Sequence, residues 1–360
     1  MMKYLVRSLI IGGWIALLSL ILYLPSSEVI PHEDNSINVF AWGDILDPAV
    51  IARFEKETKI KVNLNYYSSN EELLVKLKAN KGFGYDLIIP SDYAVALLAQ
   101  EGLLKPLDKT QLQFWKHLNP LLLGHPFDPE NVYSIPFEWE LFGFGIDQDY
   151  FNTHPLNPSW DLVFRPQDPI YRIAMVNDPV EAVSFAAFYL YGPTKELSQK
   201  QMEGVKRLLI EQKKWVEAYA SFRADYFLAT KNCPVVIASS SYLWRTMRLF
   251  PFVKTVIPKE GTFITIENLC VPALTTKEDA VYRLINYLYQ PEIVAMHFHK
   301  FGFFPSTTNS IPYLNMDPEA KALISSSPED FRKFHFINKN LPEQKIRDLW
   351  VAIKTKSQAE

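Results

Sequence analysis

The chain has 360 residues, of which 48% are hydrophobic and 21% are charged, and its formal net charge is −3. This balance is typical of a globular protein with a sizeable core in two or three domains, and it excludes a disordered chain. The slight negative charge and the lack of a basic run argue against nucleic acid as a partner.

The first 31 residues differ in composition from the rest of the chain. Lys3 and Arg7 precede an apolar run over residues 8–24, the order of segments found in a secretory signal. The run is also close to the minimum length of a membrane-spanning helix. We therefore expect residues 1–31 to be either a signal peptide that is removed or an N-terminal anchor that is kept. The remainder is expected in the periplasm. No cysteine follows the run, which argues against a lipoprotein.

The next segments alternate between strand and helix patterns. Strands are expected at residues 37–42, 60–66 and 85–90, and helices starting at Asp47-Pro48, at Asn70 and at residue 93. This order predicts an α/β lobe with a parallel, doubly wound sheet. Such sheets bind ligands beyond the carboxyl ends of their strands. Those ends carry Trp42-Gly43-Asp44 and Ser91-Asp92-Tyr93, so an aromatic and an acidic residue are expected at a binding-site entrance.

The later segments predict a second lobe and a return to the first. Residues 142–146 are expected to form a strand that crosses between the lobes, and residues 195–219 have helical periodicity. Residues 235–238 have the composition of a buried strand. Residues 269–272 are expected to return the chain to the first lobe, before a helix over residues 278–289.

The two cysteines, Cys233 and Cys270, each lie in an apolar, strand-like segment. In an exported protein they could form a disulfide, but buried free cysteines are also common, so both alternatives stay open. Their number and spacing predict no metal site. His297 and His299 are two residues apart and would not share a helix face, so they do not predict one either.

A series of motifs resembles the spermidine/putrescine-binding proteins of bacterial polyamine importers. The densest are Tyr85-Asp86-Leu87-Ile88-Ile89-Pro90-Ser91-Asp92-Tyr93 and Glu101-Gly102-Leu103-Leu104-Lys105-Pro106-Leu107-Asp108. Shorter matches follow in the same order, and the resemblance covers about residues 37–310. It is thin between residues 150 and 255.

The resemblance implies a fold and a role. The fold would be a two-lobed, periplasmic-binding-protein-like clamp, with each lobe a mainly parallel sheet flanked by helices and with crossing strands between the lobes. Lobe 1 would comprise residues 36–140 and 267–311, and lobe 2 residues 141–266 and 312–360. The protein would be a non-enzymatic monomer without a cofactor, which delivers a polyamine to the membrane permease of an ABC transporter.

The resemblance also implies a set of ligand-binding residues. These are Trp42, Asp44, Ser91, Tyr93, Asp178, Glu181 and Glu267. A polyamine has amine pKa values near that of lysine, about 10.4, so it arrives charged. Removing an ammonium group from water is costly unless a carboxylate pairs with it, and aromatic faces can pack against the methylene groups between the amines.

The chain departs from the family pattern at several aromatic positions. Ala238 and Thr265 stand where tryptophans of the second lobe are expected, and Phe303 or Phe304 replaces a tyrosine. Tyr242 and Trp244 are candidates to replace the missing aromatic walls.

Alternative interpretations stay open. Asp178 before Pro179 is also a typical helix N-cap, and Glu181 is then an ordinary acidic residue of a first turn. The same fold could bind thiamine or ferric iron instead of a polyamine. An enzyme or a surface adhesin on this scaffold is a third hypothesis, although no nucleophile–base motif is recognisable in the sequence.

Overall fold

The computed structural model describes residues 13–14, 35–166, 171–220, 224–316, 318–337 and 343–355. Apart from Gly13 and Trp14, the expected signal or anchor lies outside the described residues. The chain divides into Met1–Ser36 and a compact unit, Ile37–Glu360. Among the described residues, no helix combines the length and the apolar character needed to cross a bilayer.

A three-stranded sheet with the order β2–β1–β3 organises the first part of the compact unit. Its strands are β1 (Ser36–Trp42), β2 (Lys61–Tyr67) and β3 (Leu87–Ile88), and each is followed by a helix, α2 (Pro48–Thr58), α3 (Asn70–Asn80) and α4 (Asp92–Gln100). Strands β1 and β3 are parallel, with Val39 opposite Leu87. The strand–helix order and the parallel pairing agree with the sequence-based prediction.

Local signals explain where these helices begin. The Asp47 side chain accepts a hydrogen bond from the Ala49 amide at 2.9 Å, and Pro48 occupies the first helical position of α2. Ser69 caps α3 by accepting from the amide of Glu72. Strand β1 then presents alternate residues to two cores. Val39 faces the core that includes α2, and Phe40 faces the core that includes α3 and α4.

An eight-stranded mixed sheet forms the remainder, in the order β11–β9–β4–β7–β5–β6, with β8 and β10 also paired to β4. The strands are β4 (Ile135–Asp147), β5 (Ile173–Met175), β6 (Val216–Tyr219), β7 (Val235–Ser239), β8 (Val253–Val256), β9 (Thr262–Leu269), β10 (Phe304–Pro305) and β11 (Phe334–Phe336).

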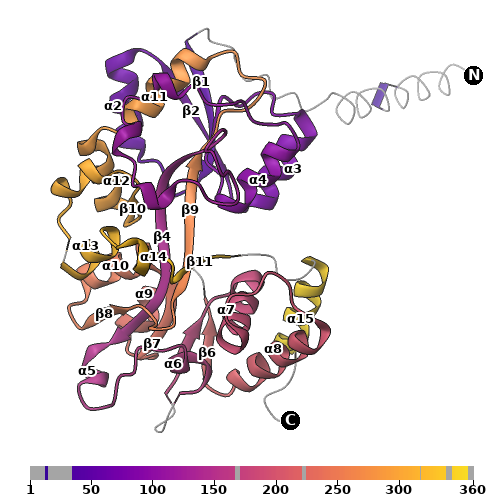
Figure 1. The fold of residues 1–360 in the computed structure, drawn as a ribbon, viewed down its shortest axis with the longest axis vertical. Coiled ribbons are helices and arrows are strands. Elements are labelled where there is room, and N and C mark those ends of the chain that lie inside the picture. Colours follow the sequence, from indigo (N-terminus) through magenta and orange to yellow (C-terminus); the bar gives the residue numbers. More distant parts are fainter. Residues whose placement is uncertain are drawn as a thin grey trace, which may run out of the picture. The chain divides into compact units, whose positions relative to one another are not determined.

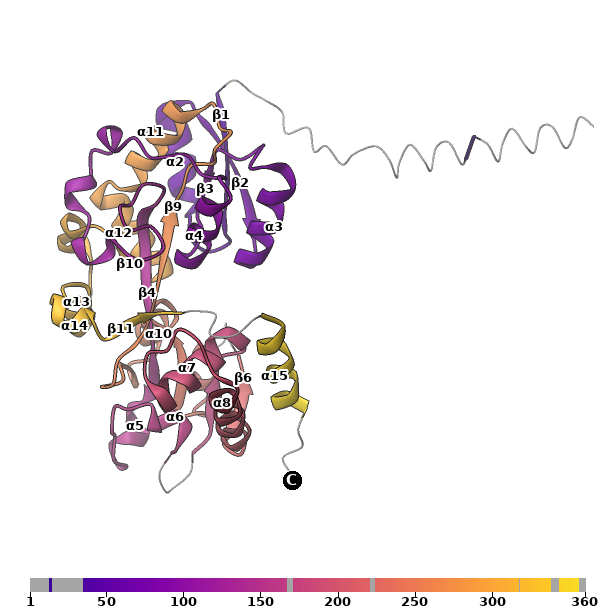
Figure 2. The same cartoon turned by 45° about the vertical axis from the view of Figure 1, so that its right-hand side comes forward.

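Helices and short 3-10 turns surround the two sheets. The helices are α5 (Gln148–Phe151), α6 (Asp161–Phe164), α7 (Pro179–Tyr191), α8 (Gln199–Gln212), α9 (Ala224–Ala229), α10 (Ser240–Leu249), α11 (Glu278–Leu288), α12 (Pro291–Phe301), α13 (Pro318–Ile324), α14 (Pro328–Phe331) and α15 (Glu343–Thr355). The 3-10 turns are η1 (Lys109–Gln111), η2 (Trp115–His117), η3 (Pro120–Leu122) and η4 (Thr308–Tyr313). Helix α15 packs beside α7 and α8 (Figure 2).

Strands β4 and β9 connect the two lobes (Figure 1). They are antiparallel, and their register runs from Ile135 opposite Leu269 to Leu141 opposite Ile264. Beyond that point β4 pairs with β7, with Phe142 opposite Ser239. The expected two-lobed fold with crossing strands is therefore confirmed. The crossing strand predicted at residues 142–146 is only the last part of β4.

Two expected elements differ from the structure in their bounds. Strand β9 ends at Leu269, so the return strand lies almost wholly before the predicted residues 269–272. Helix α8 ends at Gln212, and Val216–Tyr219 is a short strand instead of the end of a helix. In both places strand pairing with distant residues decides the structure. Cys233 and Cys270 are buried free thiols, which resolves the question of the disulfide.

Separate apolar clusters lie on the two sides of the crossing strands. One contains residues of α7, α8 and α15 with β5 and β7, and another contains residues of β1, α2 and α11. The proposed division of the lobes, residues 36–140 with 267–311 and residues 141–266 with 312–360, is compatible with these clusters and stays a prediction.

A substitution at Gly302 tests how closely the end of α12 packs against α10. It ends α12 with a φ of +84°, and a Cβ atom there would lie 2.6 Å from the backbone oxygen of Ser241 in α10. We expect Gly302→Ala to lower the free energy of unfolding by about 2–4 kcal/mol in urea denaturation, because it adds a steric clash to a left-handed backbone.

The matched control is Gly102→Ala. Gly102 has a φ of +68° but no atom within 4 Å of an added Cβ. It should lose only about 1–2 kcal/mol. Equal losses in the two variants would show that the contact with Ser241 is easily relieved.

Candidate functional site

Glu267 of β9 lies at the centre of a hydrogen-bonded group that joins three distant segments. Its carboxylate accepts from Trp42 Nε1 at 2.9 Å and from Ser91 Oγ at 2.7 Å. The Ser91 hydroxyl in turn accepts from Asn70 Nδ2 at 3.0 Å. Trp42 ends β1 and Ser91 precedes α4, so the sheet edge predicted from the sequence brings both side chains to Glu267. Glu267 is 7% exposed.

The beginning of α4 places an acid and a phenol beside this group. Asp92 is buried and accepts from the amide of Ile266 at 3.0 Å and from that of Tyr93 at 2.6 Å. The Tyr93 hydroxyl donates to Glu71 Oε1 at 3.3 Å. Burial raises the pKa of Tyr93, and the negative charges of Glu71 and Asp178 raise it further. The Tyr93 hydroxyl therefore lies in acidic surroundings, with Glu71 as its hydrogen-bond acceptor.

Asp178 and Glu181 belong to the first turn of α7. The Oδ1 atom of Asp178 accepts from the amides of Val180 and Glu181, at 2.8 and 2.9 Å, so Asp178 is the N-cap. Its side chain is exposed, whereas Glu181 is half-buried. Burial raises the pKa of Glu181, followed by the charges of Asp178 and Glu140. The N-cap interpretation thus describes one role of Asp178, and its charge still acts on Tyr93 and Glu181.

Asp44 lies apart from the group around Glu267. It is exposed in the turn after β1 and, among the described residues, forms no hydrogen bond with Trp42, Ser91 or Glu267. Its charge raises the pKa of Tyr242, after the effect of burial. In this structure the predicted binding residues therefore do not form one hydrogen-bonded cluster.

Two carboxylates that the sequence-based prediction missed lie on the crossing strands. Glu138 of β4 is directly opposite Glu267 of β9, and Glu140 is opposite Thr265. Opposite residues of an antiparallel pair point to the same face, so these acids share the face that carries Glu267. Glu140 accepts from Ser241 Oγ at 2.7 Å, at the start of α10. The alternation Glu138-Trp139-Glu140 could have indicated from the sequence that the two acids share one face of the strand, because Trp139 points into the core on the opposite face.

The pKa values of the buried acids are raised well above their usual range. Burial, with the charges of Asp92 and Glu140, raises the pKa of Glu267 to about 8 against the hydrogen bonds from Ser91 and Trp42. Burial raises the pKa of Asp92 to about 7. The pKa of Glu138 is raised well above its usual value by burial and by the charges of Glu267 and Glu140. Each shift has the sign expected for carboxylates held close together with little water.

No lysine or arginine compensates these charges at close range. Within the described ranges, the ion pairs with an N–O distance up to 4.0 Å include none of the following acids: Asp44, Asp92, Glu138, Glu140, Asp178, Glu181 and Glu267. The charge of Arg245 does act on Glu140, whose pKa it lowers, but burial is the largest influence and raises it. Among the described residues, the site therefore has more carboxyl groups than cationic side chains to pair with them.

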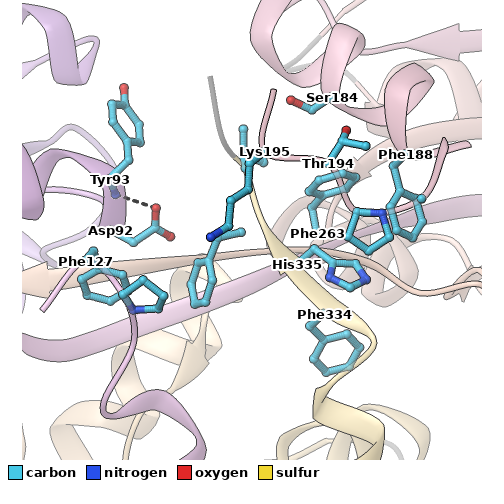
Figure 3. A pocket seen from close by; sticks show the side chains of 15 residues that line it. Asp92, Tyr93, Phe127, Ser184, Phe188, Thr194, Lys195, Phe263, Phe334 and His335 are labelled. Carbon is cyan, nitrogen blue, oxygen red and sulfur yellow. Dashed lines mark hydrogen bonds between the residues drawn. The ribbon is translucent and has the colours of Figure 1, made fainter. Parts of the chain in front are cut away.

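A cavity of about 640 Å³ is lined by one of these acids, Asp92 (Figure 3). Asp92 and Tyr93 lie on one side, and Phe188, Phe263 and His335 lie on the other. Phe263 is on the same face of β9 as Thr265 and Glu267, because alternate strand residues share a face. Of the expected aromatic residues, Tyr93 lines the cavity, and Phe188 and Phe263 are further aromatic residues that the prediction did not name. Lys195 also lines the cavity, so its charge is mixed.

The two aromatic residues suggested as replacements do not act alike. Trp244 is buried and its ring lies 4.4 Å from that of Phe298, centroid to centroid, so it packs within the core, and its suggested role stays a prediction. Tyr242 is half-buried, with the Arg245 guanidinium 4.3 Å from its ring centre. Ala238 is buried in β7, and Phe304 packs on Trp139. No group of three or more His, Cys, Asp and Glu residues suited to a metal ion occurs in the described parts of the chain.

Comparisons with known proteins agree with this description. The sequence profile of a family described as bacterial extracellular solute-binding protein matches residues 49–323. A putrescine-binding periplasmic protein of Pseudomonas aeruginosa is 31% identical over 281 residues, covering 73% of this chain and 76% of that protein. The spermidine/putrescine-binding periplasmic protein of Escherichia coli is 28% identical over 289 residues, covering 78% and 80%.

A solved structure shows the same fold. The spermidine/putrescine ABC transporter substrate-binding protein of Streptococcus pneumoniae superposes with a TM-score of 0.76 at 21% sequence identity. The match covers 89% of this chain and 98% of that protein. At this identity the similarity establishes the two-lobed α/β architecture.

The raised pKa of Glu267 predicts how stability depends on pH. The ordinary value is 4.5 and the folded value is about 8, so between these values the folded protein holds a proton that the unfolded chain has lost. The free energy of unfolding of the ligand-free protein should therefore fall as the pH rises through this window. Glu267→Gln should make calorimetric Tm values less dependent on pH. The exposed acid Glu211 provides the control Glu211→Gln, and the same slope in both variants would contradict the assignment.

Proposed function

The chain belongs to the family of bacterial extracellular solute-binding proteins, and from this membership we propose that it captures a linear polyamine of the spermidine/putrescine class. It is the substrate-binding component of an ABC transporter, a non-enzymatic protein of the periplasmic or extracellular space. Its partners are a small-molecule ligand and a membrane permease. We further propose that it acts as a monomer.

The excess of buried carboxylates is the observation that carries the ligand assignment. Glu138 and Glu267 are each less than a tenth exposed, and no ion pair among the described residues includes them. A buried charge without a partner is costly, and a multiply charged amine would supply several partners at once. An anionic ligand would meet repulsion from the same groups.

The residues suggest a division of roles along the ligand. Glu267, oriented by Trp42 and Ser91, would hold one amine. Asp178 and Glu181 at the start of α7 would hold another. Trp42 and Tyr93, both half-buried, would lie against the methylene groups and attract the cations. Asp44 would contribute from the rim, since it is exposed here.

Closure of the lobes gives this binding its role in transport. Glu267 and Tyr93 lie near the three-stranded sheet, whereas Asp178 and Glu181 belong to α7, which packs with α8. A ligand that pairs with both sets would favour the arrangement that brings them together, by its higher affinity for that state. The permease would then recognise the closed form.

A ligand panel tests the proposal. Spermidine and putrescine should raise the Tm of the purified protein, whereas thiamine and ferric citrate should not. The effect should increase from pH 4.5 to about 8, because the carboxyls of Glu267 and Asp92 lose their protons in this range while the amines stay charged. A Tm shift caused by thiamine or ferric citrate alone would favour the alternative ligands of this fold.

Charge-neutral variants of Asp178 and Glu181 test whether the start of α7 holds the second amine of the ligand. Glu181→Gln should weaken polyamine binding by about 1.5–3 kcal/mol, since it removes a half-buried, charge-assisted hydrogen bond. Asp178→Asn should cost less than about 1 kcal/mol, because Asp178 is exposed and asparagine keeps the helix cap. Isothermal titration calorimetry measures both, with Glu211→Gln as the control. Unchanged affinity in Glu181→Gln would exclude Glu181 as a binding residue.

A further inference from the structure

Glu138 has a buried carboxylate oxygen without a partner. Its side chain is 4% exposed, and Oε2 makes no hydrogen bond to any described residue. Neighbouring buried acids are satisfied. Glu140 accepts from Ser241, Asp92 accepts from two backbone amides, and Glu267 accepts from Trp42 and Ser91. Glu138 is thus the exception on the crossing strands.

Strand register determines what lies next to this carboxylate. Glu138 is directly opposite Glu267, and the next pair along the ladder is Trp139 with Ile266. Glu138 and Glu267 therefore extend from one face of the crossing strands as immediate neighbours, with their Cβ atoms about 5 Å apart. On the other side, Glu138 is opposite Pro305 of β10, which lacks an amide hydrogen to donate.

The charged and titratable groups around Glu138 cannot neutralise it. Glu267 on β9 and Glu140 on β4 both act on it with negative charge, and Asp92 of α4 acts on Glu267. Tyr289, which follows α11, is near Glu138, but its hydroxyl donates to the backbone oxygen of Pro136. Among the described residues, the groups whose charge acts on this pair are thus acids, and the nearby Tyr289 hydroxyl is already engaged elsewhere.

We propose that Glu138 and Glu267 form a two-carboxylate seat that holds one charged amine of the ligand, and that the empty seat holds a proton which the ligand displaces. This rests on the proposed function. An alkylammonium group has two or three N–H donors, so it can bond to both carboxylates at once. In the empty state, one carboxyl stays protonated because two carboxylates this close cannot both ionise easily. On binding, that O–H bond breaks and the proton passes to solvent, while the amine keeps its own protons.

Glu138→Gln tests the seat. In the wild type, calorimetric titration in buffers with different ionisation enthalpies should show proton release when spermidine binds near neutral pH. The variant should bind spermidine about ten- to a hundredfold more weakly, the effect of losing a charge-assisted hydrogen bond, and should release fewer protons. A merely structural role of Glu138 would leave the proton release unchanged. Glu211→Gln should match the wild type in both measurements.

A second variant, and a measurement without ligand, distinguish a loss of binding from a failure to fold. Glu138→Met has a similar volume without a charge or a hydrogen-bonding group. Both variants should melt at or above the wild-type temperature at pH 8 without ligand, because removing an uncompensated buried charge is stabilising. A large drop in both would show that Glu138 has a partner within the fold and would overturn the proposal.

The double variant Glu138→Gln/Glu267→Gln tests whether the two acids act as one site. If they share one amine, its loss of affinity should be clearly smaller than the product of the two single losses.

The outcomes separate this proposal from the proposed function. Wild-type binding with unchanged affinity and proton release in Glu138→Gln overturns the seat and leaves polyamine binding in place. If the wild type binds neither spermidine nor putrescine, the proposed function fails, and the seat fails with it.

Discussion

Carboxylates enclosed on the crossing strands without a cation are the constraint on which the site depends. Glu138 and Glu267 lie opposite each other in the ladder, and Glu140 follows two residues later. Like charges in such a place raise each other's proton affinity and oppose folding at neutral pH. The chain tolerates this arrangement because most of its core lies elsewhere, in the clusters around β1 and around β5 and β7. On the proposed function, part of its stability would be given up for affinity toward a cation.

The fold explains why these acids can stay in place. Strands β4 and β9 hold Glu138 and Glu267 by backbone hydrogen bonds that do not depend on the side chains. The first turns of α4, α7 and α10 approach the same region, and backbone amides at helix N-termini favour negative charge. Asp92 accepts from the Tyr93 amide at the start of α4, and Asp178 accepts from the Val180 amide at the start of α7. Glu140 accepts from the Ser241 hydroxyl in the first turn of α10. Glu267 accepts from the Trp42 and Ser91 side chains instead, whereas Oε2 of Glu138 has no hydrogen-bond partner among the described residues.

Much of the fold could be predicted from local pattern and resemblance. The start of α2 at Asp47-Pro48 and the alternation of β1 are local signals, and the structure has both. The resemblance selected Trp42, Ser91 and Glu267, which are in direct contact. Strand β6 and the start of β9 were missed, because short strands depend on partners that lie far away in sequence.

The rest of the site depends on packing that no local pattern encodes. Glu138 and Glu140 lie in a strand where acids would ordinarily indicate a solvent-facing edge, and only the register with β9 shows that they are enclosed. The exposure of Asp44 and Asp178 and the burial of Trp244 depend in the same way on how helices pack. The sequence gives the type of each residue, but whether its side chain is buried or exposed depends on the packing of the folded chain.

The register between β4 and β9 has a consequence for the speed of ligand capture. Since the backbone ladder sets the spacing of Glu138 and Glu267, folding places the two carboxyl groups together before any ligand arrives. On the proposed function, the negative charge that is left when one of them keeps its proton would act on a cationic ligand during diffusion, over a screening length of about 10 Å at 0.1 M salt. Ionic strength would then act mainly on the association rate, because steering by charge governs encounter more than retention.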